Sequence, residues 1–327
     1  MTKPLVIYGA ALAEVFAVSR RMKPQQHERR KLIVFEQGHD VWLDNAIVEA
    51  GGGGLVSAMV AARQGIKPTL VSKVGKDTIG RMVLDILNDE KITTEYLSQD
   101  PKHHSDMNVH LTVSGKDQTM LRFNGSFLSL YGKNTVMPKQ SRGYLYIATL
   151  PPELSQLKAL IAWGKQHSMT IVVHVHDVHL VKSHKLMDIL QQAELIIVNR
   201  DELSLLLGGY FEHKELLARS YNVGLRNVVI YDGLEGNMVL SETIAIELSG
   251  NNKLKLLEHT GAEDSFGAMY VSAMMLGKSA EEALHMAAAQ AEAALAVVGT
   301  RSALLRKPVV KPRKLKHYQL QNHTEDS

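Results

Sequence analysis

Residues 144–175 read YLYIATLPPELSQLKALIAWGKQHSMTIVVHV, and this stretch decides the fold class. Two short runs rich in β-branched and aromatic residues, 144–148 and 170–175, flank a segment (153–167) whose apolar residues recur with helical periodicity. A strand, a helix and a second strand in this order form a βαβ unit, in which the two strands lie parallel in one sheet.

The same alternation continues on both sides of this unit. The sequence predicts further strands at residues 5–9, 69–74, 195–198 and 227–231, and further helices at residues 55–64, 79–90, 184–192 and 201–207. Residues 262–298 are rich in Ala, Met and Leu, and they predict two more helices that are separated near Gly277. We therefore expect an α/β fold of three layers, a doubly wound and mainly parallel sheet covered by helices on both faces.

Two regions interrupt the alternation, at about residues 10–50 and 105–125. Both contain short segments of alternating polarity, and Ser114-Gly-Lys-Asp117 forms a turn-like break within the second region. They predict a small antiparallel sheet beside the main one. Such a sheet can act as a lid that excludes water from a reaction, or as a dimerisation surface, and the two roles can coexist.

Composition excludes several classes of protein. The 327 residues include no cysteine, which excludes disulfides, thiolate metal sites and a cysteine nucleophile. No apolar run approaches the ~18 residues of a membrane helix, and no signal peptide begins the chain, so we expect a soluble cytoplasmic protein.

Basic residues gather at residues 20–31 and 306–316. We interpret both clusters as solvated rather than as a nucleic-acid surface, because no aromatic residues interleave for base stacking. We expect one domain over residues 1–305 and a basic, poorly ordered tail over 306–327.

Glycine-rich turns follow two of the predicted strands. Gly51–Gly54 precedes an Ala-rich helix, and glycines there would let the backbone approach a ligand closely, although a flexible turn explains them equally. The segment Gly75-Lys-Asp-Thr-Ile-Gly80 directly follows a strand, and either a ligand contact or a simple helix cap at Asp77 accounts for it.

Two polar residues of types that bind magnesium follow the predicted strand at residues 195–198. Asn199 and Glu202 lie where an open α/β sheet binds its ligands, at the carboxyl end of a strand. An amide and a carboxylate suit Mg²⁺ that is held through water molecules. The alternative is that Asn199 caps the helix and Glu202 interacts with its dipole.

The segment His259-Thr-Gly-Ala-Glu-Asp-Ser-Phe-Gly267 carries the strongest functional signal. A turn of small residues that enters a helix presents backbone N–H groups, which can stabilise charge on a phosphoryl group in transfer. Asp264, in the first turn, can accept the proton of an attacking hydroxyl.

Together these segments resemble the ribokinase-like (PfkB-type) family of carbohydrate and nucleoside kinases. Their order is the family's order, and residues 260–264 are similar to its Thr-Gly-Ala-Gly-Asp signature. The resemblance spans roughly residues 5–305. It implies the ribokinase-like fold with a small β-sheet lid, and transfer of the γ-phosphoryl group of ATP, with Mg²⁺, to a hydroxyl of a sugar, sugar phosphate or nucleoside.

The resemblance also implies roles for individual residues. Catalysis would involve Asp264 as base with Gly261, Ala262 and Glu263; the substrate side would involve Glu14, Gly52, Gly53, Val56 and Asp77; the nucleotide side would involve Asn199, Glu202, Tyr231, Gly233 and Gly236. Asn199 and Glu202 would hold the Mg²⁺ through water. A homodimer formed through the lid is a further expectation.

The chain departs from the family's motifs at several positions. Glu263 replaces a glycine, and its carboxylate would repel phosphate unless the side chain points away. Val56 replaces an asparagine that contacts substrate hydroxyls, and Glu14 falls in an Asn-x-Asp element. Glu258 aligns with an aspartate linked to monovalent-cation binding. These departures leave one alternative function, a homologue with impaired catalysis that acts as a ligand-binding or regulatory protein.

A group of histidines ends the strand at residues 170–175, where many family members have Asp-x-Asn. Alternation places His174 and His176 on one face, whereas His179 lies beyond the expected end of the strand. We interpret these histidines, with Asp177, as pocket-lining and hydrogen-bonded. Zinc binding by the imidazoles is the alternative.

Overall fold

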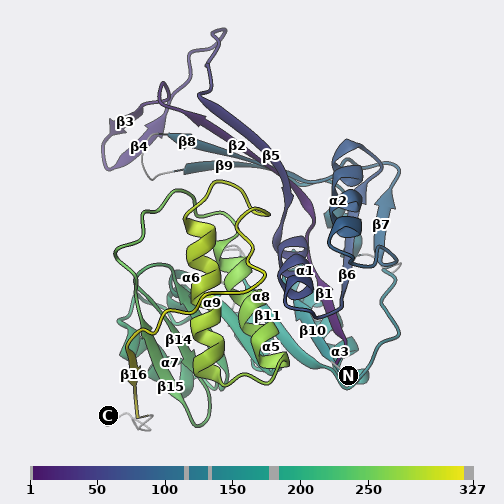
Figure 1. The fold of residues 1–327 in the computed structure, drawn as a ribbon, viewed down its shortest axis with the longest axis vertical. Coiled ribbons are helices and arrows are strands. Elements are labelled where there is room, and N and C mark those ends of the chain that lie inside the picture. The colour runs from purple at the N-terminus through teal and green to yellow at the C-terminus, as the bar shows by residue number, and fades with distance from the viewer. Residues whose placement is uncertain (1–2, 114–117, 132–134, 177–183, 320–327) are drawn as a thin grey trace.

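The computed structural model describes residues 3–113, 118–131, 135–176 and 184–319, and its centre is a sheet of ten strands (Figure 1). In spatial order the strands are β16 (Leu315–His317), β15 (Ala245–Ser249), β14 (Gly236–Leu240), β13 (Val228–Asp232), β12 (Leu195–Asn199), β11 (Thr170–Val175), β10 (Tyr144–Ile147), β1 (Leu5–Tyr8), β6 (Pro68–Gly75) and β7 (Leu97–Asp100). Neighbours from β13 to β7 pair in parallel, and those from β13 to β16 pair antiparallel.

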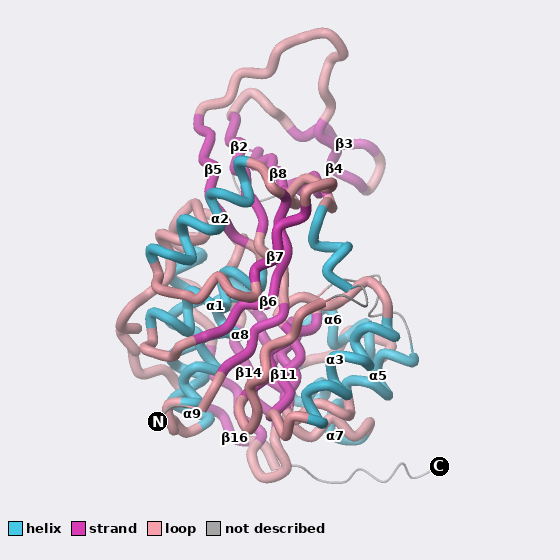
Figure 2. Tube along the Cα trace, turned by 90° about the vertical axis from the view of Figure 1, so that its right-hand side faces the viewer, coloured by secondary structure: helices cyan, strands magenta, loops and turns pink. Residues whose placement is uncertain are grey.

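Helices cover both faces of this sheet (Figure 2). One face carries α1 (Gly53–Arg63), α2 (Thr78–Asp89), α8 (Ala262–Met275) and α9 (Ala280–Leu295); the other carries α3 (Leu154–Gln166), α5 (His184–Leu190), α6 (Arg200–Leu206) and α7 (His213–Asn222). Strand β1 shows the consequence, since Leu5 and Ile7 join one core while Val6 and Tyr8 join the other. The predicted three-layer, doubly wound architecture is confirmed.

The two interrupting regions build the lid, a sheet of four strands at one end of the molecule (Figure 1). Its order is β5 (Asn45–Gly51), β2 (Leu12–Ser19), β8 (Met107–Val113) and β9 (Gln118–Phe123), with a separate hairpin of β3 (Pro24–His27) and β4 (Arg30–Ile33). A 3-10 helix, η1 (Ser126–Tyr131), leads back toward the main sheet. The small sheet is mixed rather than antiparallel, because β2 pairs in parallel with β8.

The lid leaves large apolar side chains in solvent. Trp42 is 69% exposed, and Val48, Leu121 and Phe123 are also exposed. A dimer interface would cover such side chains. Dimerisation through the lid stays a prediction.

Residues 313–318 are more ordered than their composition predicts. Leu315–His317 form the edge strand β16, which pairs antiparallel with β15. Upstream, Nη1 of Arg313 donates to Oε1 of Glu292 on α9 at 2.6 Å. The expectation of a poorly ordered tail is therefore wrong for this part of it, because its basic side chains meet acidic partners on the domain.

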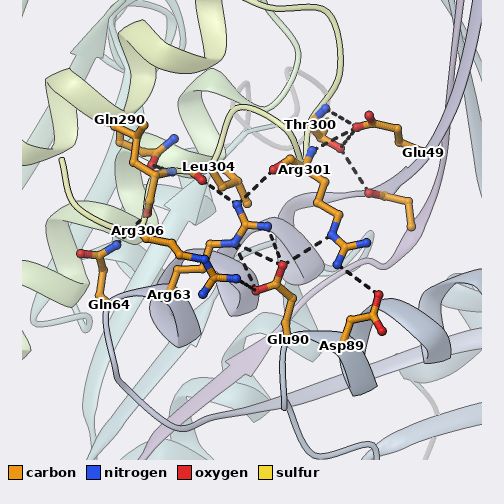
Figure 3. Close-up of polar contacts among 12 residues, drawn as sticks. Glu49, Arg63, Gln64, Asp89, Glu90, Gln290, Thr300, Arg301, Leu304 and Arg306 are labelled. Atoms are coloured by element: carbon orange, nitrogen blue, oxygen red, sulfur yellow. Dashed lines mark hydrogen bonds and ion pairs between the residues drawn. The ribbon is translucent and has the colours of Figure 1, made fainter. Parts of the chain in front are cut away.

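An ion-pair cluster joins three distant segments beside α1 (Figure 3). Glu90 follows α2, its side chain is only 3% exposed, and it accepts hydrogen bonds from Arg63 at the end of α1. Nε of Arg301 lies 3.5 Å from Oε1 of the same carboxylate, and Arg306 is 3.7 Å from Oε2. The cluster ties the loop after α9 to the main domain.

Among the described residues, no helix combines the length and apolar character needed to cross a membrane.

Candidate active site

The candidate active site lies at the carboxyl ends of the parallel strands, where α8 begins. Gly261 precedes α8 with φ of 74°, a left-handed conformation that favours glycine, and the helix starts at Ala262. Asp264 thus lies in the first turn, as predicted. The first N–H groups of a helix have no partner within it, so this turn offers donors to an anion.

The glycine run lies directly against Asp264. A Cβ atom added at Gly53 would lie 2.9 Å from Oδ1 of Asp264 and 2.7 Å from the carbonyl oxygen of Ala148. A Cβ at Gly54 would lie 2.5 Å from the carbonyl carbon of Gly9, and Gly52 has φ of 87°. The run therefore has to be glycine so that the start of α1 can approach both the strand ends and Asp264.

Glu263 points toward the strands. Its Oε1 is 3.2 Å from Nε2 of His174 on β11, and its Oε2 accepts from Nδ2 of Asn199 at 3.1 Å. The carboxylate therefore has two fixed partners, which hold it at the ends of β11 and β12.

The two neighbouring carboxyl groups differ in their electrostatics. Burial raises the pKa of Asp264, although the charges of His176 and His174 oppose this shift. Burial also disfavours ionisation of Glu263, but the hydrogen bond from His174, with the charges of His174 and His176, outweighs it and lowers the pKa. Glu263 is thus the more stable anion, and Asp264 is the better proton acceptor.

The histidines have definite hydrogen-bond partners, as predicted. Nδ1 of His174 lies 3.1 Å from the hydroxyl of Tyr146, and Nε2 of His176 lies 2.7 Å from the carbonyl oxygen of Ala148. Burial lowers the pKa of His176, but the charges of Asp264, Glu263 and Glu202 and the hydrogen bond to Ala148 together outweigh it, and the net shift is upward. Asp177 and His179 fall outside the described residues.

Asn199 and Glu202 adopt the helix-capping arrangement. Oδ1 of Asn199 accepts from the N–H of Glu202 at 2.8 Å, so Asn199 caps α6. Glu202 is buried. Both lie at the ligand-binding edge of the sheet, so capping and a role at a metal are compatible. Their contact with Mg²⁺ stays a prediction.

On the predicted substrate side, Asp77 caps α2. One of its oxygens accepts from the N–H of Gly80 at 2.9 Å, and both accept from Ser105. Its pKa is lowered because these hydrogen bonds outweigh burial. Val56 is only 1% exposed and packs in the core beneath α1, so it adds no polar group to a pocket.

Glu14 belongs to a buried chain of contacts that the sequence did not predict. Its Oε2 is 2.6 Å from Nε2 of His110 on β8, and Nδ1 of His110 is 3.3 Å from Oγ1 of Thr260. That hydroxyl donates to Oε1 of Glu258 at 2.9 Å. The lid is thereby joined to the turn that precedes Asp264. In the sequence, only the alternation of apolar and polar residues along β8 pointed to His110.

The other predicted nucleotide-side residues lie at the end of β13 and in the turn that leads to β14. Gly233 and Gly236 have φ of 55° and 146°, both in the region that favours glycine. Tyr231, at the end of β13, packs against Phe266 of α8 with ring centroids 5.1 Å apart. Tyr231 pairs with Asn199 across β12 and β13, so these positions share an edge of the sheet, and the nucleotide site there stays a prediction.

The structure combines a doubly wound α/β sheet with an aspartate that lies beside glycines in the first turn of a helix, at the carboxyl ends of the strands. This combination is typical of α/β proteins that bind anionic ligands at that edge of the sheet. The model of the pfkB family carbohydrate kinases matches residues 33–307. The chain therefore belongs to the PfkB family of carbohydrate kinases, as the motif resemblance predicted.

Individual relatives are distant in sequence but cover most of the chain. A ribokinase of Arabidopsis thaliana is 22% identical over 310 residues, which are 90% of this chain and 77% of the relative. The structure of Arabidopsis thaliana ribokinase with ribose and ATP superposes with a TM-score of 0.71 at 20% identity, covering 93% and 96% of the two chains. A Burkholderia thailandensis nucleoside kinase with inosine gives 0.72 at 13% identity, covering 92% and 94%. The chain therefore has the ribokinase fold.

Proposed function

We propose that this protein is an ATP-dependent kinase that phosphorylates a hydroxyl of a sugar, sugar phosphate or nucleoside, with Asp264 as the base. The single observation that carries the proposal is the approach of Gly53 to Asp264, where a Cβ would lie 2.9 Å from Oδ1. Only glycine lets the first turn of α1 lie this close to the carboxylate, and we place the acceptor hydroxyl beside this junction of α1 and α8. Membership of a family of carbohydrate kinases supports the reaction class.

In the proposed reaction, Asp264 takes the proton from the acceptor hydroxyl while the oxygen attacks the γ-phosphorus and ADP leaves. The raised pKa of Asp264, caused by burial, suits it to this role. The backbone N–H groups at residues 261–264 would stabilise charge on the phosphoryl oxygens. Glu263 is held by His174 and Asn199, which offsets its repulsion of phosphate.

The chain's donor set fits Mg²⁺ bound through water molecules. Asn199 at the carboxyl end of β12 and Glu202 in the first turn of α6 provide an amide and a carboxylate, and Mg²⁺ prefers a few such oxygens with several waters retained. When bound with ATP, the ion would neutralise charge on the phosphates. The solved ribokinase of Arabidopsis thaliana with ATP supports ATP as the donor. A monovalent cation near Glu258 remains part of the proposal.

The test is release of ADP over a panel of sugars, sugar phosphates and nucleosides, with Asp264→Asn compared to Asp201→Asn. Asp201 also lies in the first turn of a helix at this edge, but it is exposed. We expect one acceptor to stimulate release, and Asp264→Asn to lower kcat about 10²–10⁴-fold with little change in binding. Unchanged turnover in Asp264→Asn would refute the assignment of the base.

A second candidate is a homologue with impaired catalysis, and Glu263 favours it. A carboxylate in the first turn of α8 weakens a site for phosphate even when it is held by other side chains. This alternative predicts nucleotide or ligand binding in calorimetry with no ADP released from any acceptor. Turnover gained in Glu263→Gly would then identify this residue as the cause.

A further inference from the structure

Two histidines and Asp264 come together at the end of β11. One donor atom from each of His174, His176 and Asp264 can be chosen so that all three lie within 4.8 Å of one another. Within the described part of the chain, this is the one group of three or more histidine, aspartate or glutamate side chains with such spacing. Two ligand atoms bound to one zinc ion are at most about 4 Å apart, so the three side chains must draw together slightly to bind it.

Hydrogen bonds determine which ring nitrogen of each histidine is available to bind a metal ion. Nε2 of His176 is 2.7 Å from the carbonyl oxygen of Ala148, which can only accept, so Nε2 carries the hydrogen. Nε2 of His174 faces the Glu263 carboxylate at 3.2 Å and carries its hydrogen for the same reason. In a neutral imidazole the other nitrogen then has a free lone pair. Both histidines can therefore offer Nδ1.

The Nδ1 atom of His174 is directed toward Asp264. It lies 3.8 Å from Oδ1 of Asp264 and 3.1 Å from the Tyr146 hydroxyl, whose hydrogen turns away when Nδ1 binds a metal. The His174 and His176 rings stand nearly perpendicular, at 85° with centroids 5.0 Å apart. Two imidazoles in fixed, different planes and a carboxylate from another element can occupy three corners of a tetrahedron.

The surroundings match those of histidine ligands in metalloproteins. Such histidines usually donate their second ring N–H to a carboxylate or a backbone carbonyl, which fixes the ring and its tautomer. Glu263 supplies the carboxylate for His174 and is itself held by Asn199, while Ala148 supplies the carbonyl for His176. Glu263 thus has a function at the position where the family motif has glycine.

Charge also favours a divalent cation here. Asp264 and Glu263 are adjacent carboxylates beside strand ends, and the Tyr146 hydroxyl, Asn199 amide and Ala148 carbonyl carry no formal charge. A divalent ion would balance the two negative charges. Imidazole nitrogens exclude Mg²⁺ and Ca²⁺ as the preferred occupants, because those ions select oxygen ligands.

We propose that His174, His176 and Asp264 bind a zinc ion, with Glu263 as the residue that positions His174. Three protein ligands leave a fourth position for water or for an oxygen of a bound ligand. The Asp264 oxygens would then serve the metal instead of accepting a proton, so zinc should inhibit the proposed kinase reaction. The zinc site itself does not depend on that reaction.

The test uses the full-length chain without a histidine tag, stripped of metal and titrated with Zn²⁺ alone against a chromophoric chelator. We expect one equivalent to bind, and Co²⁺ to give the intense visible absorption of a four-coordinate ion. Glu263→Gln should weaken zinc affinity about 10–100-fold, the usual effect of losing a partner of a ligand. His176→Ala, which removes a ligand, should weaken zinc affinity by at least the upper end of that range.

Controls separate zinc binding from misfolding. His176 is half-buried whereas His174 is fully buried, so His176→Ala is the safer variant, with its fold checked by circular dichroism. His285→Ala on α9, whose ring bonds to the carbonyl of Glu281, should bind zinc normally. Binding of less than one equivalent to the parent chain, or unchanged affinity in folded His176→Ala, would overturn the proposal and leave a hydrogen-bonded cluster only. Zinc binding, together with no ADP release by the zinc-free protein, would sustain it while refuting the proposed function.

Discussion

Gly53 and Asp264 lie so close that a Cβ on the glycine would be 2.9 Å from Oδ1 of the aspartate. The two residues are more than two hundred positions apart and lie in the first turns of two different helices, α1 and α8. The same Cβ would be 2.7 Å from the carbonyl oxygen of Ala148, which is backbone and cannot move aside easily. Side chains at position 53 are therefore excluded by both contacts.

Gly53→Ala should lower turnover because it displaces Asp264 or the start of α1. A shift of about 1 Å in a catalytic group can cost about 10²-fold in rate, and we expect a loss of kcat approaching that size. Steady-state kinetics with the identified acceptor measures it. Gly164→Ala is the matched control, since its Cβ would also lie 3.0 Å from side chains, those of Ile171 and Leu145. A similar loss of kcat in both variants would contradict the prediction.

Glu49 anchors the lid to the loop after α9 (Figure 3). Its Oε2 accepts from the N–H groups of Thr300 and Arg301 at 2.8 and 3.1 Å. A Cβ at Gly261 would meet Thr300 at 3.4 Å, so this loop also touches the start of α8. The lid and the turn that precedes α8 thus share one support.

Glu49→Ala should speed hydrogen exchange at residues 45–51 and 299–301 without unfolding the chain. Hydrogen bonds to a charged group contribute about 1.5–3 kcal/mol each, so these segments should open more easily. Exchange followed by mass spectrometry measures the effect. Glu36→Gln, at an exposed position of the lid region, should leave both segments unchanged. Equal exchange in Glu49→Ala and the parent chain would mean that the lid is held elsewhere.

Glu90 should make stability depend on pH. Hydrogen bonds from Arg63 are the main cause that lowers its pKa, assisted by the charges of Arg63, Arg301 and Arg306 and opposed by burial. A lowered folded pKa means that the ionised carboxylate stabilises the fold above the ordinary value of 4.5. That contribution is lost as the pH falls through the folded pKa.

Glu90→Gln should therefore lower the free energy of unfolding by about 3 kcal/mol at neutral pH, as removal of one partner of a buried pair usually does. Denaturant unfolding from neutral pH to below 4.5 should show the gap to the parent chain narrowing. Glu215→Gln, which breaks an exposed pair with Arg219, should cost only about 0.5 kcal/mol. A gap that is independent of pH would show that the carboxylate charge is not responsible.

The periodic spacing of apolar residues in the sequence predicted those strands and helices in which this spacing is regular. Residues 170–175 agree with β11, and the start of α8 falls at the predicted turn. What the sequence could not predict depends on long-range pairing. The parallel register of β2 with β8 and the contact between His110 and Glu14 join segments nearly a hundred residues apart. Motif spacing identified Asp264, but only the fold shows that Glu263 faces His174.

The final prediction concerns the C-terminal strand. Glu247 on β15 is only 5% exposed, and it accepts from Nζ of Lys316 at 2.8 Å and from the hydroxyl of Tyr318. These hydrogen bonds are the main causes that lower its pKa against burial.

A chain that ends at Pro312 loses these partners, the pairing of β16 and the Arg313–Glu292 ion pair. It should lose about 3 kcal/mol in denaturant unfolding, since the buried carboxylate loses its lysine partner and keeps only His213, 3.5 Å away. Lys311→Ala, which keeps β16, should match the parent chain. If the shortened chain were as stable as the parent chain, β16 would contribute nothing measurable to the stability of the fold.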